Sequence, residues 1–170
     1  MKKFYELIES ICFPVIVITV LILFICRVIV VDGDSMTNTL YDGEKVIITN
    51  FFYEPEKGDI VVTDGRIHNG RPLIKRVIAI EGDTIEIDYS TGNVTINGQV
   101  IQEDYIKEKI NTDNNKQDIK ITIPEGYLFL MGDNRNGSLD SRELGIVDKQ
   151  DILGKAIFRI SPLSRIGRVK

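Results

Sequence analysis

Ser35 is the first residue whose position suggests chemistry, because its hydroxyl would lie close to the end of a long apolar run. That run ends at Val31, four residues earlier. A serine hydroxyl is a weak nucleophile and needs a neighbouring base to take its proton. The chain has a single histidine, His68, and it falls in segment 64–70, whose Asp-Gly and Asn-Gly pairs are typical of a solvated loop tip. A different base is therefore needed.

Lys75 is the better candidate for that base. The segment LIKRVIAI reads as a strand, and a period of two places Leu73, Lys75, Val77 and Ala79 on one face. Apolar surroundings disfavour the ammonium form, so the pKa of such a lysine falls from about 10.4 toward the value near 7 that suits a general base. A Ser–Lys dyad is an accepted variant of the serine-hydrolase arrangement. Taken from this segment alone, an edge-strand lysine that reaches water is the commoner arrangement.

A third segment, residues 131–143, places polar and ionic groups directly after the apolar run Tyr127–Met131. One interpretation is a calcium loop. Counted from Gly132, four EF-hand positions carry suitable residues: Asn134, Asn136, Gly137 and Glu143. The first position lacks its carboxylate, however, and no helix leads into the segment. A loop held by Asp–Arg pairs, with Ser138 or Ser141 available to bond a neighbour, is the favoured alternative.

The N-terminus supplies an element that would hold these groups at a membrane. Residues 11–26 read ICFPVIVITVLILFIC, which as a helix would span roughly 24 Å against a hydrocarbon core of ~30 Å, and apolar flanks can make up the difference. We expect a head, a transmembrane anchor and an outer domain, at residues 1–10, 11–31 and 32–170. A cleaved signal peptide is the alternative, but no small-x-small site follows the run. A uniform apolar run also disfavours a buried core helix.

Charge and cysteine usage limit what the outer domain can do. Lys2 and Lys3 favour a cytoplasmic N-terminus, which places the domain outside the membrane. Residues 28–170 carry 18 basic and 23 acidic residues, and this net charge of −5 argues against nucleic-acid binding. Cys12 and Cys26 both lie in the apolar run, so the domain has neither a disulfide nor a cysteine zinc site.

The outer domain is expected to be mainly β. Short β-branched runs separated by turn residues predict nine strands: Lys45–Thr49, Asp59–Thr63, Leu73–Ile80, Thr84–Asp88, Asn93–Ile96, Gln99–Ile101, Ile119–Ile123, Tyr127–Met131 and Gly154–Ile160. Only Glu103–Ile110 resembles a helix, and weakly. Nine strands with one minor helix favour an antiparallel, Greek-key or barrel-like domain.

The C-terminal residues 155–170 form a basic tail, with no acidic residue after Asp151. A solvated tail is the favoured interpretation. Contact with anionic lipid headgroups is the alternative.

Three segments in order make the chain similar to the bacterial type I signal peptidases, the membrane-bound peptidases of family S26. The family box Gly-x-Ser-Met-x-Pro-Thr-Leu is matched by residues 33–40, which read GDSMTNTL. The lysine box Lys-Arg-Val-x-Ala is matched by KRVIA at 75–79. The late box Gly-Asp-Asn-Arg-x-x-Ser-x-Asp-Ser-Arg is matched at every specified position by residues 132–142. The similarity runs to about residue 160 and is closest to the single-anchor Gram-positive members.

This resemblance implies roles for particular residues. Ser35 would be the nucleophile, Lys75 the general base, and Ser138 the residue that orients the lysine amine. Four residues would hold the site by ion pairs: Asp133, Arg135, Asp140 and Arg142. Gly33 and Met36 would lie near the oxyanion hole and the substrate pocket. The fold implied is an antiparallel β-barrel-like catalytic domain after one transmembrane helix, without metal or cofactor.

The implied function is removal of N-terminal signal peptides from exported preproteins by a monomeric, single-pass membrane serine endopeptidase whose catalytic domain lies outside the cell. Membrane lipid and signal peptides would be its partners. Asn38 departs from the family pattern, which has proline there, and the lost restraint on φ predicts a less rigid loop after Ser35. Two alternatives stay open: a membrane-anchored β domain that binds peptides without cutting them, and a peptidase dedicated to a few substrates such as pilus subunits.

Overall fold

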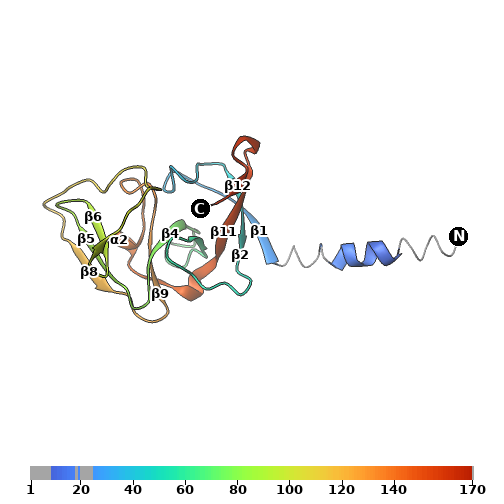
Figure 1. Cartoon of the computed structure of the whole chain (residues 1–170), viewed down its shortest axis with the longest axis horizontal. Coiled ribbons are helices and arrows are strands. Elements are labelled where there is room, and N and C mark those ends of the chain that lie inside the picture. Colours follow the sequence, from blue (N-terminus) through green and yellow to red (C-terminus); the bar gives the residue numbers. More distant parts are fainter. Residues whose placement is uncertain (1–8, 18, 20–24, 170) are drawn as a thin grey trace.

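Two antiparallel sheets make up most of the computed structural model, which describes residues 9–17, 19 and 25–169 (Figure 1). Sheet A has the strand order β1-β2-β11-β3-β4-β9-β10, with β12 paired to β11, and sheet B has the order β7-β6-β5-β8. The sheet A strands are β1 (Cys26–Val30), β2 (Lys45–Thr49), β3 (Ile60–Thr63), β4 (Ile74–Ile80), β9 (Tyr127–Met131), β10 (Val147–Asp148), β11 (Ile152–Ser161) and β12 (Gly167–Arg168). The sheet B strands are β5 (Thr84–Asp88), β6 (Asn93–Ile96), β7 (Gln99–Val100) and β8 (Ile119–Thr122). The expectation of a mainly β, antiparallel domain is confirmed.

Burial along the strands follows the alternation in the sequence. In β5 the side chains of Ile85 and Ile87 are buried between half-exposed neighbours, and they pack with Phe129 and Met131 of β9 in the core that joins the two sheets. β4 is different because it lies inside sheet A between β3 and β9. Its residues 75–79 are all buried, so both faces of this strand are covered.

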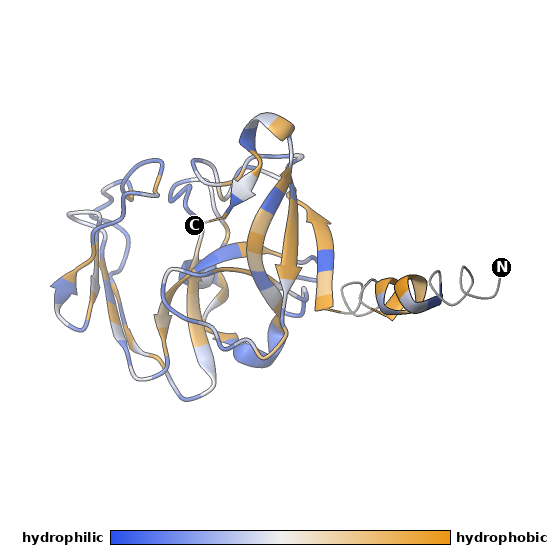
Figure 2. Cartoon of the chain, turned by 45° about the vertical axis from the view of Figure 1, so that its right-hand side comes forward, coloured by the Kyte–Doolittle hydropathy of each residue, from blue (hydrophilic) through white to orange (hydrophobic). Residues whose placement is uncertain are grey.

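β1 corrects the expected end of the membrane anchor. Residues 26–30 form an extended strand that pairs with β2, from Cys26 opposite Thr49 to Val30 opposite Lys45. They form the edge strand of sheet A rather than the last turns of a helix. β-branched valine and isoleucine fit a pleated sheet as well as an apolar span, and the partner strand decides between them. In Figure 2 the strand that continues from the N-terminal segment is coloured mostly as hydrophobic.

The N-terminal segment is only partly described. Residues 9–17 are helical, whereas 1–8, 18 and 20–24 of the expected head and anchor lie outside the described residues. Within the described part of the chain, no helix is both long enough and apolar enough to cross a bilayer.

The helix expected at Glu103–Ile110 is absent, which is a second correction. This segment has turns and one isolated β-bridge between Glu108 and Asn134. It has one internal turn hydrogen bond, from Ile106 N to Glu103 O at 3.3 Å, and its next N–H, that of Lys107, donates to the distant Asp133 O at 3.1 Å. The described α-helix within the domain is the short α2 (Ser141–Leu144), whose N-cap is Asp140.

Candidate active site

The loop that carries Ser35 spans residues 32–44 between β1 and β2, and we call it the Ser35 loop. A tight turn follows the serine, with Thr37 N donating to Asp34 O at 3.0 Å and Leu40 N donating to Met36 O at 2.8 Å. Met36 and Leu40 are almost fully buried in the core under β2 and β11. These two apolar side chains fix the turn and leave the half-buried Ser35 facing outward.

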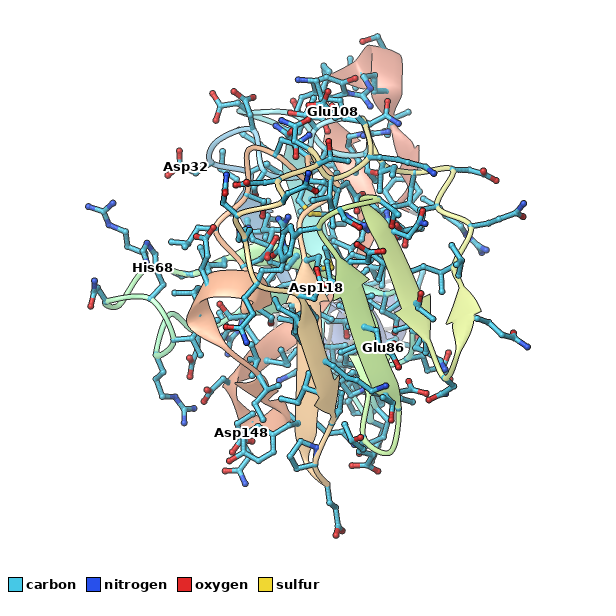
Figure 3. The ribbon with its side chains drawn as sticks, turned by 90° about the vertical axis from the view of Figure 1, so that its left-hand side faces the viewer. Asp32, His68, Glu86, Glu108, Asp118 and Asp148 are labelled. Atoms are coloured by element: carbon cyan, nitrogen blue, oxygen red, sulfur yellow. The ribbon has the colours of Figure 1, made fainter. Side chains whose placement is uncertain are left out.

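Lys75 reaches Ser35 from β4. Its Nζ lies 2.8 Å from Oγ of Ser35 and 2.9 Å from the carbonyl oxygen of Ile74, and it donates to both. Lys75 is only 3% exposed, so it is not an edge-strand lysine that reaches water. His68 lies on a loop that projects from the side of the molecule (Figure 3). The structure therefore brings together the serine and the lysine that the sequence singles out.

Burial changes the acidity of Lys75. Removal from water lowers the pKa of its amine from 10.5 to about 8, with a smaller contribution in the same direction from Arg142. The negative charges of Asp140 and Asp133 act in the opposite direction and keep the pKa from falling further. A pKa near 8 leaves a useful fraction of neutral amine at neutral pH, as a general base requires.

The late loop, residues 132–140, is fastened directly to the Ser35 loop. The backbone N–H of Asn134 donates to Ser35 O at 3.0 Å, and its side chain donates to Asp34 O at 3.1 Å. Gly132 N donates to Asp140 Oδ2 at 2.9 Å. These hydrogen bonds hold the late loop against the Ser35 loop.

Gly132 lies where the two loops approach most closely. A Cβ at this position would collide with Oγ of Ser138 and with the carbonyl oxygen of Ser35. Oγ of Ser138 is buried and has no hydrogen-bond partner among the described residues. The structure thus places Ser138 beside the serine loop, but it does not contain the Ser138–Lys75 hydrogen bond that the resemblance implies.

Three ion pairs support the site from beneath. Arg76, next to Lys75, donates to both carboxylate oxygens of Asp133 at 2.9 and 2.7 Å, and both side chains are buried. Arg142 binds Asp140 at 2.8 Å, and although burial alone would raise the pKa of the Asp140 carboxyl, these contacts hold it below its usual range. The buried Arg135 pairs with Glu103, a partner that the sequence did not indicate.

The basic tail takes part in this support, which corrects the expectation of a solvated tail. Arg159 and Arg165 bind the buried Glu44 at 3.0 and 2.7 Å. Arg159 also donates to the carbonyl oxygen of Thr39 at 2.9 Å, inside the Ser35 loop. Arg159 and Glu44 are 115 residues apart in the sequence, so no local sequence pattern could predict their contact.

A cleft of about 510 Å³ leads to Ser35 and Lys75. Its walls come from residues 29–32, at the end of β1, and from residues 71–75, at the start of β4. Met36 also lines it, as expected, whereas Gly33 does not. Gly33 instead has a φ of +83° and donates its N–H to Asp42 Oδ1 at 2.8 Å, so it shapes the turn.

The carboxylates of the late loop bind arginines rather than forming a cation site. Asp133 and Asp140 each face a guanidinium group, as above. Across residues 9–17, 19 and 25–169, no group of three or more histidine, cysteine or acidic side chains could hold a metal ion. The arrangement at Ser35 is a serine hydroxyl in contact with a buried amine.

Comparisons with known proteins agree with this geometry. The sequence pattern of the family described as "Signal peptidase, peptidase S26" matches residues 4–161. A signal peptidase I of Bacillus licheniformis is 33% identical over 97% of this chain and 92% of its own length. A signal peptidase IB of Staphylococcus aureus is 32% identical over 96% of this chain and 92% of its own. A crystal structure of a signal peptidase I from Enterococcus faecalis has a TM-score of 0.51 at 31% identity and covers 61% of this chain and 97% of that one.

Proposed function

The chain belongs to the signal peptidase family S26, and from this premise we propose that it cleaves N-terminal signal peptides from exported preproteins as a membrane-bound serine endopeptidase. The observation that carries the proposal is the 2.8 Å contact between the amine of Lys75 and the hydroxyl of Ser35, made by a lysine removed from water. Burial supplies a reason for the amine to be neutral, and the contact supplies the path for the proton.

The reaction begins when the neutral amine of Lys75 accepts the hydroxyl proton of Ser35 along this contact. Oγ then attacks the carbonyl carbon of the scissile bond, and the leaving amine takes a proton from the lysine. Water then attacks the acyl carbonyl while the neutral amine takes its proton, and the resulting ammonium returns that proton to Oγ of Ser35 as the ester bond breaks. The first proton transfer uses two groups that lie 2.8 Å apart in the structure.

The backbone N–H of Ser35 is the first donor for the oxyanion. It makes no hydrogen bond within the described residues, so it is free to bind a developing negative charge. Its carbonyl, in contrast, is held by Asn134 N, and this orients the peptide unit that follows the serine.

The substrate lies as an extended strand between the two walls of the cleft. β1 is an edge strand, so its side away from β2 can accept a substrate strand by β-augmentation, although both backbone groups of Val31 are bonded to Gly43 and Glu44. Residues 71–75 face the end of β1 across the cleft. Met36 lines the cleft, and the resemblance to signal peptidases implies that the side chains before the scissile bond are small.

The apolar segment before β1 anchors the enzyme in the membrane, with the N-terminus in the cytoplasm and the catalytic domain outside. Because β1 follows that segment directly, and Ser35 follows β1 by only five residues, the cleft opens close to the bilayer surface. A signal peptide inserted in the same bilayer presents its cleavage site at that height. We propose a monomer, because the dyad and both cleft walls come from one chain.

The test is cleavage of a preprotein by the full chain in detergent micelles. Ser35→Ala and Lys75→Ala should each abolish product formation, while Ser90→Ala, at an exposed serine in the β5–β6 turn, should cleave normally. Circular dichroism then checks that the inactive variants are folded. A wild type that binds the signal peptide without cutting it would favour the peptide-binding alternative. A panel of preproteins distinguishes a general peptidase from a dedicated one.

A further inference from the structure

Asn38 has a backbone conformation that proline cannot adopt. Its φ is +102°, whereas the proline ring holds φ near about −65°. Asparagine is enriched among the residues that tolerate positive φ. Asn38 lies three residues after Ser35, at the position where the resemblance leads one to expect proline. The Ser35 loop of this chain therefore follows a path that is closed to the usual residue.

The side chain of Asn38 connects the Ser35 loop to residues 103–111, a segment that we call the arm. Nδ2 donates to the carbonyl oxygen of Tyr105 at 3.2 Å and to that of Ile106 at 3.4 Å. These contacts span more than 65 residues of sequence. The prediction of a less rigid loop considered only the loss of the proline ring. It did not include these hydrogen bonds, which the asparagine side chain can donate and proline cannot.

The arm also contacts the strand that carries the lysine. The guanidinium of Arg76 lies over the ring of Tyr105, 4.0 Å from its centroid. Arg76 is the residue after Lys75 on β4. The same tyrosine residue therefore accepts a hydrogen bond from the serine side and packs against the lysine side.

The late loop completes the connection. Lys107 N donates to Asp133 O at 3.1 Å, and Glu108 forms the β-bridge with Asn134. Asn134 in turn donates its backbone N–H to Ser35 O at 3.0 Å. The arm thus contacts all three segments of the site, and Asn38 provides its direct hydrogen bonds to the Ser35 loop.

We propose that Asn38 is a positioning residue that holds the hydroxyl of Ser35 within reach of the amine of Lys75 by tying the Ser35 loop to the arm. The inference rests on the proposed function, since the placement of Ser35 matters only if it is the nucleophile. The restraint that family members obtain from a proline ring comes here from a carboxamide and its two acceptors. Restoring the family proline should therefore lower the kcat of this enzyme.

Three variants separate the backbone contribution of Asn38 from that of its side chain. Asn38→Gly permits positive φ but removes the donor, and kcat should fall about tenfold. Asn38→Pro excludes positive φ and also removes the side-chain donor, and kcat should fall about 100-fold. Asn38→Asp keeps the shape but turns a carboxylate toward two carbonyl oxygens, so it should be no better than glycine. KM should change less than about twofold, because Asn38 does not itself line the cleft.

The pH dependence of kcat gives a readout that a merely structural role would not move. In Asn38→Gly the serine hydroxyl moves away and water reaches the amine of Lys75. The acidic limb of the profile should then shift to higher pH, toward the pKa of a solvated lysine amine. The matched control is Asn97→Gly, at another positive-φ asparagine, in the β6–β7 turn, whose side chain accepts from Thr84 N and donates to Asp83. This control should lower Tm but leave kcat and the limb unchanged.

The outcomes divide cleanly. The proposal is supported if kcat is highest in the wild type, lower in Asn38→Gly and lowest in Asn38→Pro, and if the acidic limb of the pH profile is shifted in Asn38→Gly. It is overturned by a proline variant as active as wild type, by an Asn38→Gly kcat that matches wild type, by an unmoved limb, or by an equal kcat loss in Asn97→Gly. An inactive wild type counts against the proposed function, whereas an active wild type with insensitive Asn38 variants counts against this inference alone.

Discussion

Replacing Lys75 by methionine should abolish cleavage and also make the fold more stable at pH 7. Burial lowers the pKa of the amine from 10.5 to about 8. At about 1.36 kcal/mol per pKa unit, folding therefore penalises the protonated amine by about 3 kcal/mol. Methionine has a similar length and no charge, so it avoids that penalty. It also loses the two hydrogen bonds of Nζ, worth about 1 kcal/mol each, which leaves a net gain of about 1 kcal/mol.

The pH dependence of this difference is the sharper part of the prediction. Between pH 8 and 10.5 the unfolded state holds more protons on Lys75 than the folded state does, so wild-type stability rises with pH across that window. The penalty is almost fully present at pH 7 and nearly gone above pH 10.5. The stability advantage of Lys75→Met should therefore shrink by about 2 kcal/mol between pH 7 and pH 10.

The assay is urea unfolding of the full chain in detergent, followed by far-ultraviolet circular dichroism because the chain has no tryptophan. Lys120→Met is the matched control, since this side chain is 71% exposed and gives up little hydration on folding. Its effect on stability should be the same at both pH values. A Lys75→Met difference that stays constant from pH 7 to pH 10 would refute the reasoning that burial keeps the base neutral.

Three further predictions concern the support of the site and its membrane contact. Gly132→Ala should reduce kcat at least tenfold with a smaller effect on Tm, because a Cβ would push apart Ser138 and the carbonyl of Ser35. A normal kcat would show that the late loop can accommodate the added Cβ without moving Ser35. Asp133→Asn leaves a buried guanidinium without its counter-charge and should cost about 3–5 kcal/mol in urea unfolding, and a loss under about 1 kcal/mol would contradict this. Phe51 and Phe52 are 59% and 93% exposed in the loop after β2, next to the point where the chain enters the domain. Changing both to serine should weaken retention on anionic vesicles, whereas a serine at the exposed Val100 of sheet B should not, and equal losses would assign no special role to the aromatic pair.

Local patterns predicted nine of the twelve described strands, because these nine alternate or run apolar within their own sequence, whereas the two-residue β10 and β12 were missed. β2, β5, β6 and β9 have the predicted bounds. The same reasoning failed for β1, since an apolar β-branched run is compatible with a membrane helix until the partner strand is known. It also failed for the arm, where residues that favour a helix weakly bond instead to loops far along the chain.

The dyad could be anticipated from the sequence, whereas its supports could not. Ser35 and Lys75 stand in recognisable segments, and a buried lysine has few structural reasons to exist. Glu103 and Glu44 lie in segments with no distinctive pattern, yet they bind buried or half-buried arginines at the site. Such contacts depend on the packed fold, because ion pairs across long separations have no signature in the spacing of residues.

The distribution of these supports follows from the position of β1 at the edge of sheet A. In the proposed complex a substrate strand pairs with that edge, and among the described residues no other strand covers it. Restraint must then come from the other sides. It comes from Arg159 at the carbonyl of Thr39, from Asn134 at the carbonyl of Ser35, and from the arm at Asn38. An enzyme that leaves its nucleophile open to an extended peptide therefore needs side-chain cross-links in the loop behind it, and a residue that departs from the family pattern in that loop is a natural place to find one.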